Sequence, residues 1–283
     1  MIKWNMIVDV DKCCNCNNCA LAIKDEYVGN AFPGYSAPQP PSGHEWFAID
    51  QVVRGSGSLV DVSYIPRTCN HCDDAPCIKA GEGAVTKRPD GIVIIDPVKA
   101  KGNKALVNSC PYGAISWNEA EQLPQHWPFD AHLLDGGWKE PRCVQVCPTG
   151  ALRSLKVSDD EMAAIVEREQ LTTIKPLLKT RPRIYYRGLE RTKAAFVGGN
   201  VAIRSQDGRL DNVAGAQVEV SLPDNGTVVR VVTDHFGDFR ADGFNASGKS
   251  YFVRVSHSEF GEAMYSGELH SSVNIGTVEL RVG

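Results

Sequence analysis

Ten cysteines, all before residue 148 of the 283, constrain this chain more than any other feature of its sequence. Six of them form two closely spaced triplets, which are Cys13, Cys16 and Cys19, and Cys69, Cys72 and Cys77. Two more, Cys110 and Cys147, each begin a copy of the sequence Cys-Pro-x-Gly-Ala far downstream of a triplet. Three neighbouring thiolates can converge on one face of a metal cluster, and a distant cysteine can reach its fourth corner. The pattern therefore predicts a fold organised around metal.

The first triplet has the spacing that opens a bacterial ferredoxin run, C-x2-C-x2-C-x3-C-P, in which the fourth cysteine binds the other cluster. The same spacing counted onward from Cys19 reaches Ile23, and counted from Cys77 it reaches Gly81. Each triplet has therefore lost the fourth cysteine of its own run. Two triplets need two remote ligands, and the chain supplies two Cys-Pro sites.

Degenerate repeats indicate which remote cysteine belongs to which triplet. Counting back from Cys110 by the ferredoxin spacing reaches Ala100, Asn103 and Leu106, so this run has kept its fourth cysteine and lost its triplet. If paired runs exchange ligands, the run ending at Cys110 belongs with the second triplet and the run ending at Cys147 with the first. Two [4Fe-4S] clusters are predicted, the first on Cys13, Cys16, Cys19 and Cys147 and the second on Cys69, Cys72, Cys77 and Cys110.

Two cysteines remain outside this assignment, and two other uses of cysteine compete with it. Cys14 is expected to be a small buried apolar residue and Cys143 a free thiol. Structural zinc is the rival for the triplets, but triplets with Cys-Pro partners do not have zinc spacing. Disulfides are disfavoured because a chain of this size needs no covalent staples. His71, between Cys69 and Cys72, is expected to donate a hydrogen bond to a sulfur or to face solvent.

Length and the distribution of cysteines predict two domains with different folds. Residues 1–180 are expected to form a ferredoxin-like iron-sulfur domain with insertions, and residues 181–195, rich in basic residues, a linker. Residues 196–283 carry short runs of alternating apolar residues between turn signals, which predicts an antiparallel β-sandwich of about seven strands. The fold class is therefore α+β.

Two local structures can be predicted inside the first domain. Residues 83–96 read as a β-hairpin around Arg88-Pro-Asp-Gly91, whose residues suit a tight turn. Ser158 and Glu161 have the spacing of a capping box, which predicts a helix over residues 159–171.

The charge and hydropathy of the chain exclude some partners. A net charge of −4 and a pI near 6.0 give no reason to expect binding to nucleic acid or to an anionic membrane. Residues 1–12 do not have the pattern of a signal peptide and no run of about 18 apolar residues occurs, so a protein without membrane contact is expected, cytoplasmic unless a partner carries an export signal.

Several phrases carry a resemblance to a known family. AVTKRPDGIVIIDP, SCPYGAISWNE and RPRIYYRGL look like the iron-sulfur subunits of molybdopterin enzymes of the dimethyl sulfoxide reductase family, over about residues 5–190. With GYSAPQPPSGHEW, AHLLDGGW and a C-terminal β-sandwich, the chain most resembles the small subunits of the pyrogallol-phloroglucinol transhydroxylase family and related polyphenol hydroxylases. The sandwich resembles the transthyretin and carboxypeptidase-regulatory type.

The resemblance implies that this chain is not catalytic itself. The active site would lie in a large partner subunit that carries molybdenum or tungsten on two pterin guanine dinucleotides and acts on polyhydroxylated aromatics. Two alternatives stay open: the chain is the electron-transfer subunit of a resorcinol-type hydroxylase or of another oxidoreductase of the family, or it is a scaffold whose clusters are never reduced in turnover.

The resemblance also implies a third cluster in the relatives, which this chain is expected to lack. Its ligand positions correspond here to Ile23, Trp127 and Asp130, together with Cys143. Tryptophan and isoleucine cannot bind iron, so the third cluster is predicted to be absent. A transhydroxylase moves a hydroxyl group without net electron flow, and it would tolerate this loss better than a hydroxylase.

Overall fold

The computed structural model describes residues 1–281, and the chain forms two compact units. Unit 1 comprises residues 1–51 and 63–189, and unit 2 comprises residues 52–62 and 190–283. Unit 2 therefore includes a short segment from early in the chain, which composition did not indicate. This segment is the tip of a hairpin between β2 (Phe47–Ser56) and β3 (Leu59–Thr68).

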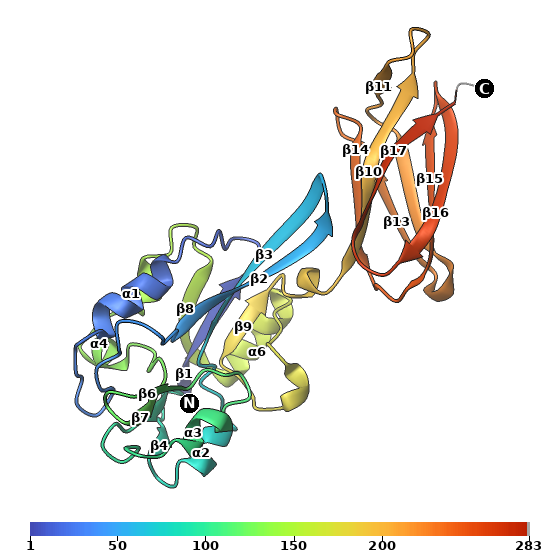
Figure 1. Cartoon of the computed structure of the whole chain (residues 1–283). Helices are drawn as coiled ribbons and strands as arrows, with labels where there is room; N and C mark the ends of the chain where they lie inside the picture. The colour runs from blue at the N-terminus through green and yellow to red at the C-terminus, as the bar shows by residue number, and fades with distance from the viewer. Residues whose placement is uncertain (282–283) are drawn as a thin grey trace. The chain divides into compact units, whose positions relative to one another are not determined.

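Unit 1 is built on a three-stranded sheet in the order β8-β1-β9 (Figure 1). β1 (Ile2–Asp9) is antiparallel to β8 (Leu152–Ser158) and parallel to β9 (Ile184–Arg187). β9 lies inside the segment that the sequence indicated as a linker. The side chain of Tyr186 on β9 is fully buried, and its hydroxyl donates to the Pro66 carbonyl oxygen at 3.0 Å. Alternating apolar residues thus place this short stretch in the sheet despite its basic neighbours.

A helix covers one part of this sheet. α6 (Asp159–Arg168) packs Met162 and Ile165 against Ile7 of β1. Ser158 caps the helix by accepting a hydrogen bond from the Glu161 backbone N–H at 3.2 Å, which confirms the predicted start. The helix ends at Arg168, three residues earlier than predicted.

Short hairpins and helices fill the rest of unit 1. β4 (Val85–Lys87) and β5 (Val93–Ile95) form the predicted hairpin, with Gly91 at φ +87° in its turn. β6 (Ser116–Asn118) and β7 (Leu123–Gln125) form another. Single turns complete the unit, at α4 (Ala131–Asp135) and at the 3-10 helix η1 (Pro176–Leu178). Among residues 1–281 no helix has the length and apolar character needed to cross a bilayer.

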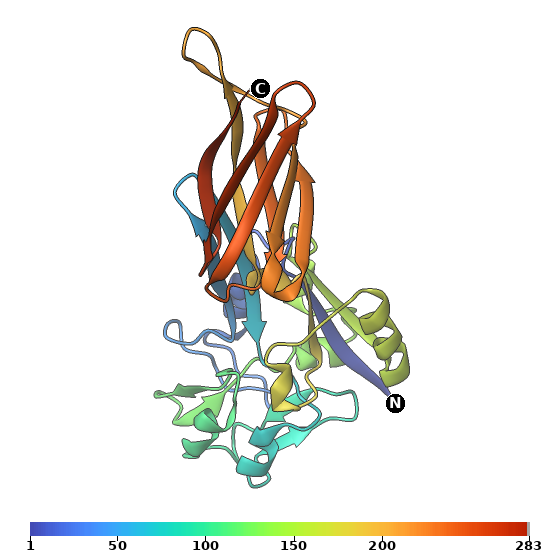
Figure 2. The same cartoon turned by 90° about the vertical axis from the view of Figure 1, so that its right-hand side faces the viewer.

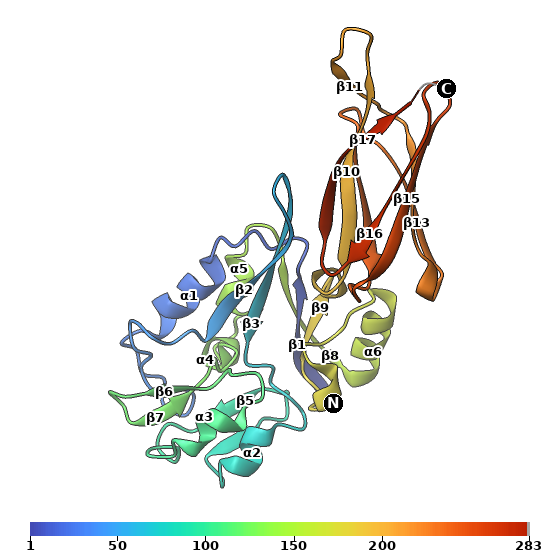
Figure 3. The ribbon, with the colours of Figure 1, turned by 45° about the vertical axis from the view of Figure 1, so that its right-hand side comes forward.

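Two pairs of helices determine where the cysteines lie. α1 (Asn18–Tyr27) lies beside α5 (Arg142–Gln145), and α2 (Pro76–Ala80) lies beside α3 (Ala105–Ser109) (Figure 3). α1 and α2 each contain the last cysteine of a triplet, while α5 and α3 each end just before a Cys-Pro site. The same arrangement therefore occurs twice.

Unit 2 consists of two four-stranded sheets that share one apolar core (Figure 2). One sheet contains β10 (Ala195–Arg204), β11 (Leu210–Asn212), β14 (Asp238–Phe244) and β17 (Val273–Leu280). The other contains β12 (Gln217–Leu222), β13 (Thr227–Val232), β15 (Lys249–His257) and β16 (Gly261–Leu269). The 3-10 helices η2 (Glu190–Thr192) and η3 (Pro223–Asn225) lie in its connections.

The β-rich character of unit 2 agrees with the sequence analysis, but one detail of the prediction is wrong. The sheets contain eight strands, and β17 pairs with β10 in parallel, so the unit is not wholly antiparallel. The connection after β16 returns the chain in the direction of β10, and alternation of apolar residues carries no information about strand direction.

Candidate metal centres

The first cysteine group is assembled where α1 and α5 meet. Cys13, Cys16, Cys19 and Cys147 line one cavity, although the last of them is more than a hundred residues away in sequence. The rest of its wall is mainly apolar, with Ile49, Pro66, Ala151 and Leu152, and includes Cys14, Asn17 and Thr149. These are the four residues that the sequence assigned to the first cluster.

The loop that carries the first triplet turns through residues with unusual backbone angles. Asn15 and Asn17 have φ of 59° and 60°, in the left-handed region that asparagine tolerates better than most residues. The backbone N–H groups of Asn15 and Ala20 donate to the sulfurs of Cys13 and Cys19. The asparagines between the cysteines thus let the loop curl around its sulfurs and aim amide hydrogens at them.

The repeated Cys-Pro-x-Gly-Ala sequence folds into the same turn at both sites. The Gly113 N–H donates to the Cys110 carbonyl oxygen at 3.1 Å, and the Gly150 N–H donates to the Cys147 carbonyl oxygen at 3.2 Å. The glycines have φ of +66° and +62°, which residues with a β-carbon adopt only at a cost. Proline suits the second position of such a turn because its φ is already fixed. The repeat is therefore a turn that presents a cysteine.

The second cysteine group lies where α2 and α3 meet. Cys69, Cys72, Cys77 and Cys110 are close enough that their charges affect one another: burial raises the pKa of Cys69, and Cys110, Cys77 and Cys72 raise it further. Burial, with Cys110 and Cys72, raises the pKa of Cys77 to about 12. These four residues are the set that the sequence assigned to the second cluster.

Both groups have the donors that an iron-sulfur cluster requires. Each offers four cysteine sulfurs, and thiolates are the ligands that hold [4Fe-4S] clusters. In the first group burial raises the pKa of Cys19 to about 12, so thiolates there need a cationic core to balance their charge. The residues present therefore fit a cluster in each group.

Two residues near the second group were missed by the sequence analysis. The Thr180 hydroxyl forms hydrogen bonds with the Cys72 sulfur and, at 2.6 Å, with the Tyr112 hydroxyl. Lys87 Nζ donates to the carbonyl oxygens of His71 at 2.9 Å and of Cys72 at 3.0 Å. Both residues lie outside any cysteine run, and no spacing rule connects them to a sulfur.

The two remaining cysteines have different surroundings. Cys14 is exposed, so the prediction that it is a buried apolar residue is wrong. It lies in a loop whose residues 14–17 are all exposed, so packing does not bury a side chain there. Cys143 is fully buried, and its role as a free thiol stays a prediction.

The positions that correspond to a third cluster are filled by packed side chains. Ile23, Trp127, Asp130 and Cys143 are each at most 1% exposed. Asp130 Oδ1 accepts hydrogen bonds from the Tyr27 hydroxyl at 2.9 Å and from Trp127 Nε1 at 2.8 Å. Asp130 Oδ2 accepts from the Arg142 backbone N–H at 2.8 Å. Both carboxylate oxygens of Asp130 are therefore committed to protein donors.

Comparison with known proteins agrees with this geometry. Residues 60–157 match the model of a family described as 4Fe-4S dicluster domain. The pyrogallol hydroxytransferase small subunit of Pelobacter acidigallici is 40% identical over 89% of this chain and 93% of its own length. The arsenate respiratory reductase iron-sulfur subunit of a Shewanella species is 33% identical over 65% of this chain and 96% of its own. A tetrathionate reductase subunit of Salmonella typhimurium is 29% identical over 66% of this chain and 73% of its own. The chain therefore belongs to the family of iron-sulfur subunits that includes the pyrogallol hydroxytransferase small subunit.

Proposed function

We propose that this chain is the iron-sulfur subunit of a molybdopterin enzyme that acts on polyhydroxylated aromatics. The 40% identity to the pyrogallol hydroxytransferase small subunit over nearly the full length of both chains is the observation that carries this proposal. The catalytic centre, molybdenum or tungsten on two pterin guanine dinucleotides, belongs to a large partner subunit. The chain itself contributes no catalytic residue.

The two cysteine groups are the functional sites of the chain. The first cluster is assigned to Cys13, Cys16, Cys19 and Cys147, and the second to Cys69, Cys72, Cys77 and Cys110. A [4Fe-4S] cluster, when bound, supplies one-electron transfer. The backbone amides that point at the sulfurs stabilise negative charge on them, and Ile49, Pro66 and Leu152 form an apolar wall beside the first group.

The residues that occupy the site of the third cluster favour transhydroxylation over net hydroxylation. Trp127, Asp130 and Tyr27 form a closed hydrogen-bond network there, with no cysteine set to hold iron. A chain with two clusters and a packed protein segment in place of a third suits a reaction that exports no electrons. The relatives named as arsenate and tetrathionate reductase subunits support the second candidate, an electron-transfer subunit of a hydroxylase or reductase.

Unit 2 is assigned a structural or interaction role. Its two sheets bury a common core, which supports a β-sandwich of the transthyretin or carboxypeptidase-regulatory type. Such a fold serves many unrelated functions, so the fold itself indicates no chemistry.

Turnover of the complex separates the two functions. The chain would be purified with its large subunit and assayed with pyrogallol and with resorcinol, with and without an external electron acceptor. Transhydroxylation predicts turnover of pyrogallol that needs no acceptor. Turnover that depends on an acceptor would contradict it and favour the hydroxylase.

A further inference from the structure

Two buried histidines lie beside the second cysteine group and have no assigned role. His71 is 2% exposed and His126 is 5% exposed. One ring nitrogen of each and the sulfur of Cys69 all lie within 4.8 Å of one another. Among the residues that the structure describes, Nε2 of His71 and Nε2 of His126 are buried without a hydrogen-bond partner. A buried polar atom without a partner costs about 1–3 kcal/mol, so such atoms normally meet a group that binds there.

The neighbours of His71 determine which of its nitrogens carries hydrogen. The Val93 backbone N–H donates to His71 Nδ1 at 3.1 Å, so Nδ1 must hold a lone pair. The ring is therefore neutral and carries its hydrogen on Nε2. His71 thus carries a hydrogen-bond donor on Nε2, in a ring of which one nitrogen lies within 4.8 Å of the Cys69 sulfur.

His71 is also held firmly in this orientation. Its φ is 44°, and Lys87 Nζ fixes its carbonyl oxygen with a hydrogen bond of 2.9 Å. The ring packs edge to face against Phe129 at 5.2 Å and Trp127 at 5.9 Å between centroids. The side chain cannot turn to seek another acceptor without losing these contacts.

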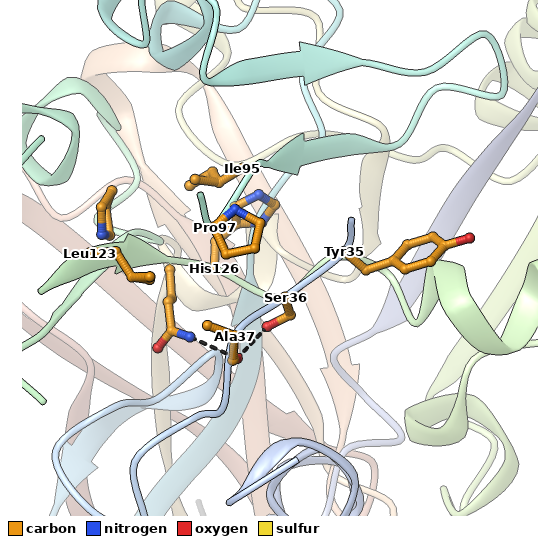
Figure 4. A pocket seen from close by; sticks show the side chains of 9 residues that line it. Tyr35, Ser36, Ala37, Ile95, Pro97, Leu123 and His126 are labelled. Carbon is orange, nitrogen blue, oxygen red and sulfur yellow. Dashed lines mark hydrogen bonds between the residues drawn. The ribbon is translucent and has the colours of Figure 1, made fainter. Parts of the chain in front are cut away.

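His126 is the competing acceptor for this hydrogen. Its Nδ1 lies 2.7 Å from the Trp127 carbonyl oxygen, so Nδ1 donates and Nε2 is left with a lone pair. The two imidazole centroids are 5.7 Å apart, and no hydrogen bond joins the rings. Figure 4 shows His126 behind Pro97 and near Ile95, in the lining of a cavity of about 10 Å³. That volume suffices for about one water molecule, so His126 has a route to a partner that does not involve His71.

We propose that His71 donates its Nε2–H to sulfur on the Cys69 side of the second cysteine group and so raises the reduction potential of the cluster held there. A hydrogen bond to a cluster sulfur stabilises the extra negative charge of the reduced state. The structure offers no equivalent imidazole among the residues that line the first cavity, so the effect is specific to the second cluster. The inference rests on the proposed function because it requires a cluster at that group.

Two substitutions of His71 separate the donor from the structural role of the ring. In His71→Gln the amide nitrogen reaches the position of Nε2 and keeps a donor there. In His71→Asn the amide oxygen reaches the position of Nδ1, so it can still accept from Val93, but the donor to sulfur is lost. His126→Phe removes the competing acceptor and serves as the third variant.

The readout is a reductive titration of the full chain, reconstituted without oxygen and followed by electron paramagnetic resonance. The signal of the second cluster is identified by its loss in Cys110→Ser, and the first cluster serves as the internal control. We expect His71→Asn to shift the second potential downward, while His71→Gln and His126→Phe keep it near the wild-type value. An unchanged potential in His71→Asn overturns the inference, as does an equal downward shift in His126→Phe, which would show that disturbed packing and not the lost donor moves the potential. Iron content measured in parallel separates the two proposals: a wild-type chain without iron contradicts the cluster assignment, whereas a chain with iron and an unchanged potential in His71→Asn contradicts the role of His71 alone.

Discussion

Asp130 offers a strong test of the hydrogen-bond network that fills the site of the third cluster. Its carboxylate is fully buried and accepts from the Tyr27 hydroxyl, Trp127 Nε1 and the Arg142 backbone N–H. Asp130→Ala removes the acceptor of all three donors, of which the Tyr27 hydroxyl has another acceptor in reach, His132 Nδ1 at 3.4 Å. In Asp130→Asn, the amide oxygen can face Tyr27 and Trp127, and only the Arg142 N–H then meets another donor.

The expected losses follow from the number of donors left unpaired. Each costs about 1–3 kcal/mol of unfolding free energy, so Asp130→Asn is expected to lose about 1–3 kcal/mol. Asp130→Ala is expected to lose more than about 3 kcal/mol, since it leaves Trp127 Nε1 and the Arg142 N–H unpaired and opens a small cavity. Burial raises the pKa of Asp130, which shows that its charge is costly in the fold. Neither variant has to bury this charge, so the loss of unfolding free energy in each is expected toward the lower end of its range.

Urea unfolding of the full chain at matched iron content measures these losses. Tryptophan fluorescence reports on the network because Trp127 is part of it. Asp160→Asn, which changes an exposed carboxylate on α6, is the matched control and is expected to leave the midpoint nearly unchanged. If both Asp130 variants unfold within about 0.5 kcal/mol of the wild type, Asp130 does not hold the network together.

Three further predictions concern the cysteine groups and their surroundings. Cys147→Ser and Cys110→Ser should each remove one cluster signal and about four irons, whereas Cys14→Ser should remove none because the first group has its four sulfurs without Cys14; loss of a cluster in Cys14→Ser would contradict the ligand assignment. Gly150→Ala places a β-carbon at φ +62°, at a cost of about 1–2 kcal/mol, and should lower iron occupancy of the first group only. Burial alone would raise the pKa of Asp73, but hydrogen bonds from its arginine and lysine partners outweigh burial and lower it. The ionised Asp73 carboxylate therefore stabilises the fold above its unfolded pKa of about 3.9, and this contribution is lost as the pH falls through the lower pKa of the folded chain. Asp73→Asn should accordingly make the free energy of unfolding less dependent on pH between about pH 2 and pH 5, which unfolding measurements over this range would show.

The sequence predicted the local structures whose signals lie within a few residues. The hairpin of β4 and β5 follows from its turn residues, and the start of α6 follows from Ser158 and Glu161. The grouping of each cysteine triplet with one distant Cys-Pro site could also be expected, because ferredoxin spacing relates each triplet to the run that ends at that site. The structure adds the physical reason: each triplet helix packs beside the helix that precedes a Cys-Pro turn.

Features that depend on distant packing were not accessible from the sequence. Thr180 reaches Cys72 only because two backbone hydrogen bonds hold the two segments together: the Asp74 N–H donates to the Thr180 carbonyl oxygen, and the Asp73 N–H donates to the Arg181 carbonyl oxygen. The parallel pairing of β17 with β10, and the assignment of residues 52–62 to unit 2, likewise depend on where the chain returns in space. The exposure of Cys14 depends on how one loop curls, which composition does not record.

Iron and acid-labile sulfide content of the full chain, purified without oxygen, tests the central claim most directly. Two clusters, each held by one of the two cysteine groups, predict about eight irons and eight sulfides per chain. About twelve irons would contradict the replacement of the third cluster by Trp127 and Asp130. A chain that contains no iron would contradict the assignment of both groups.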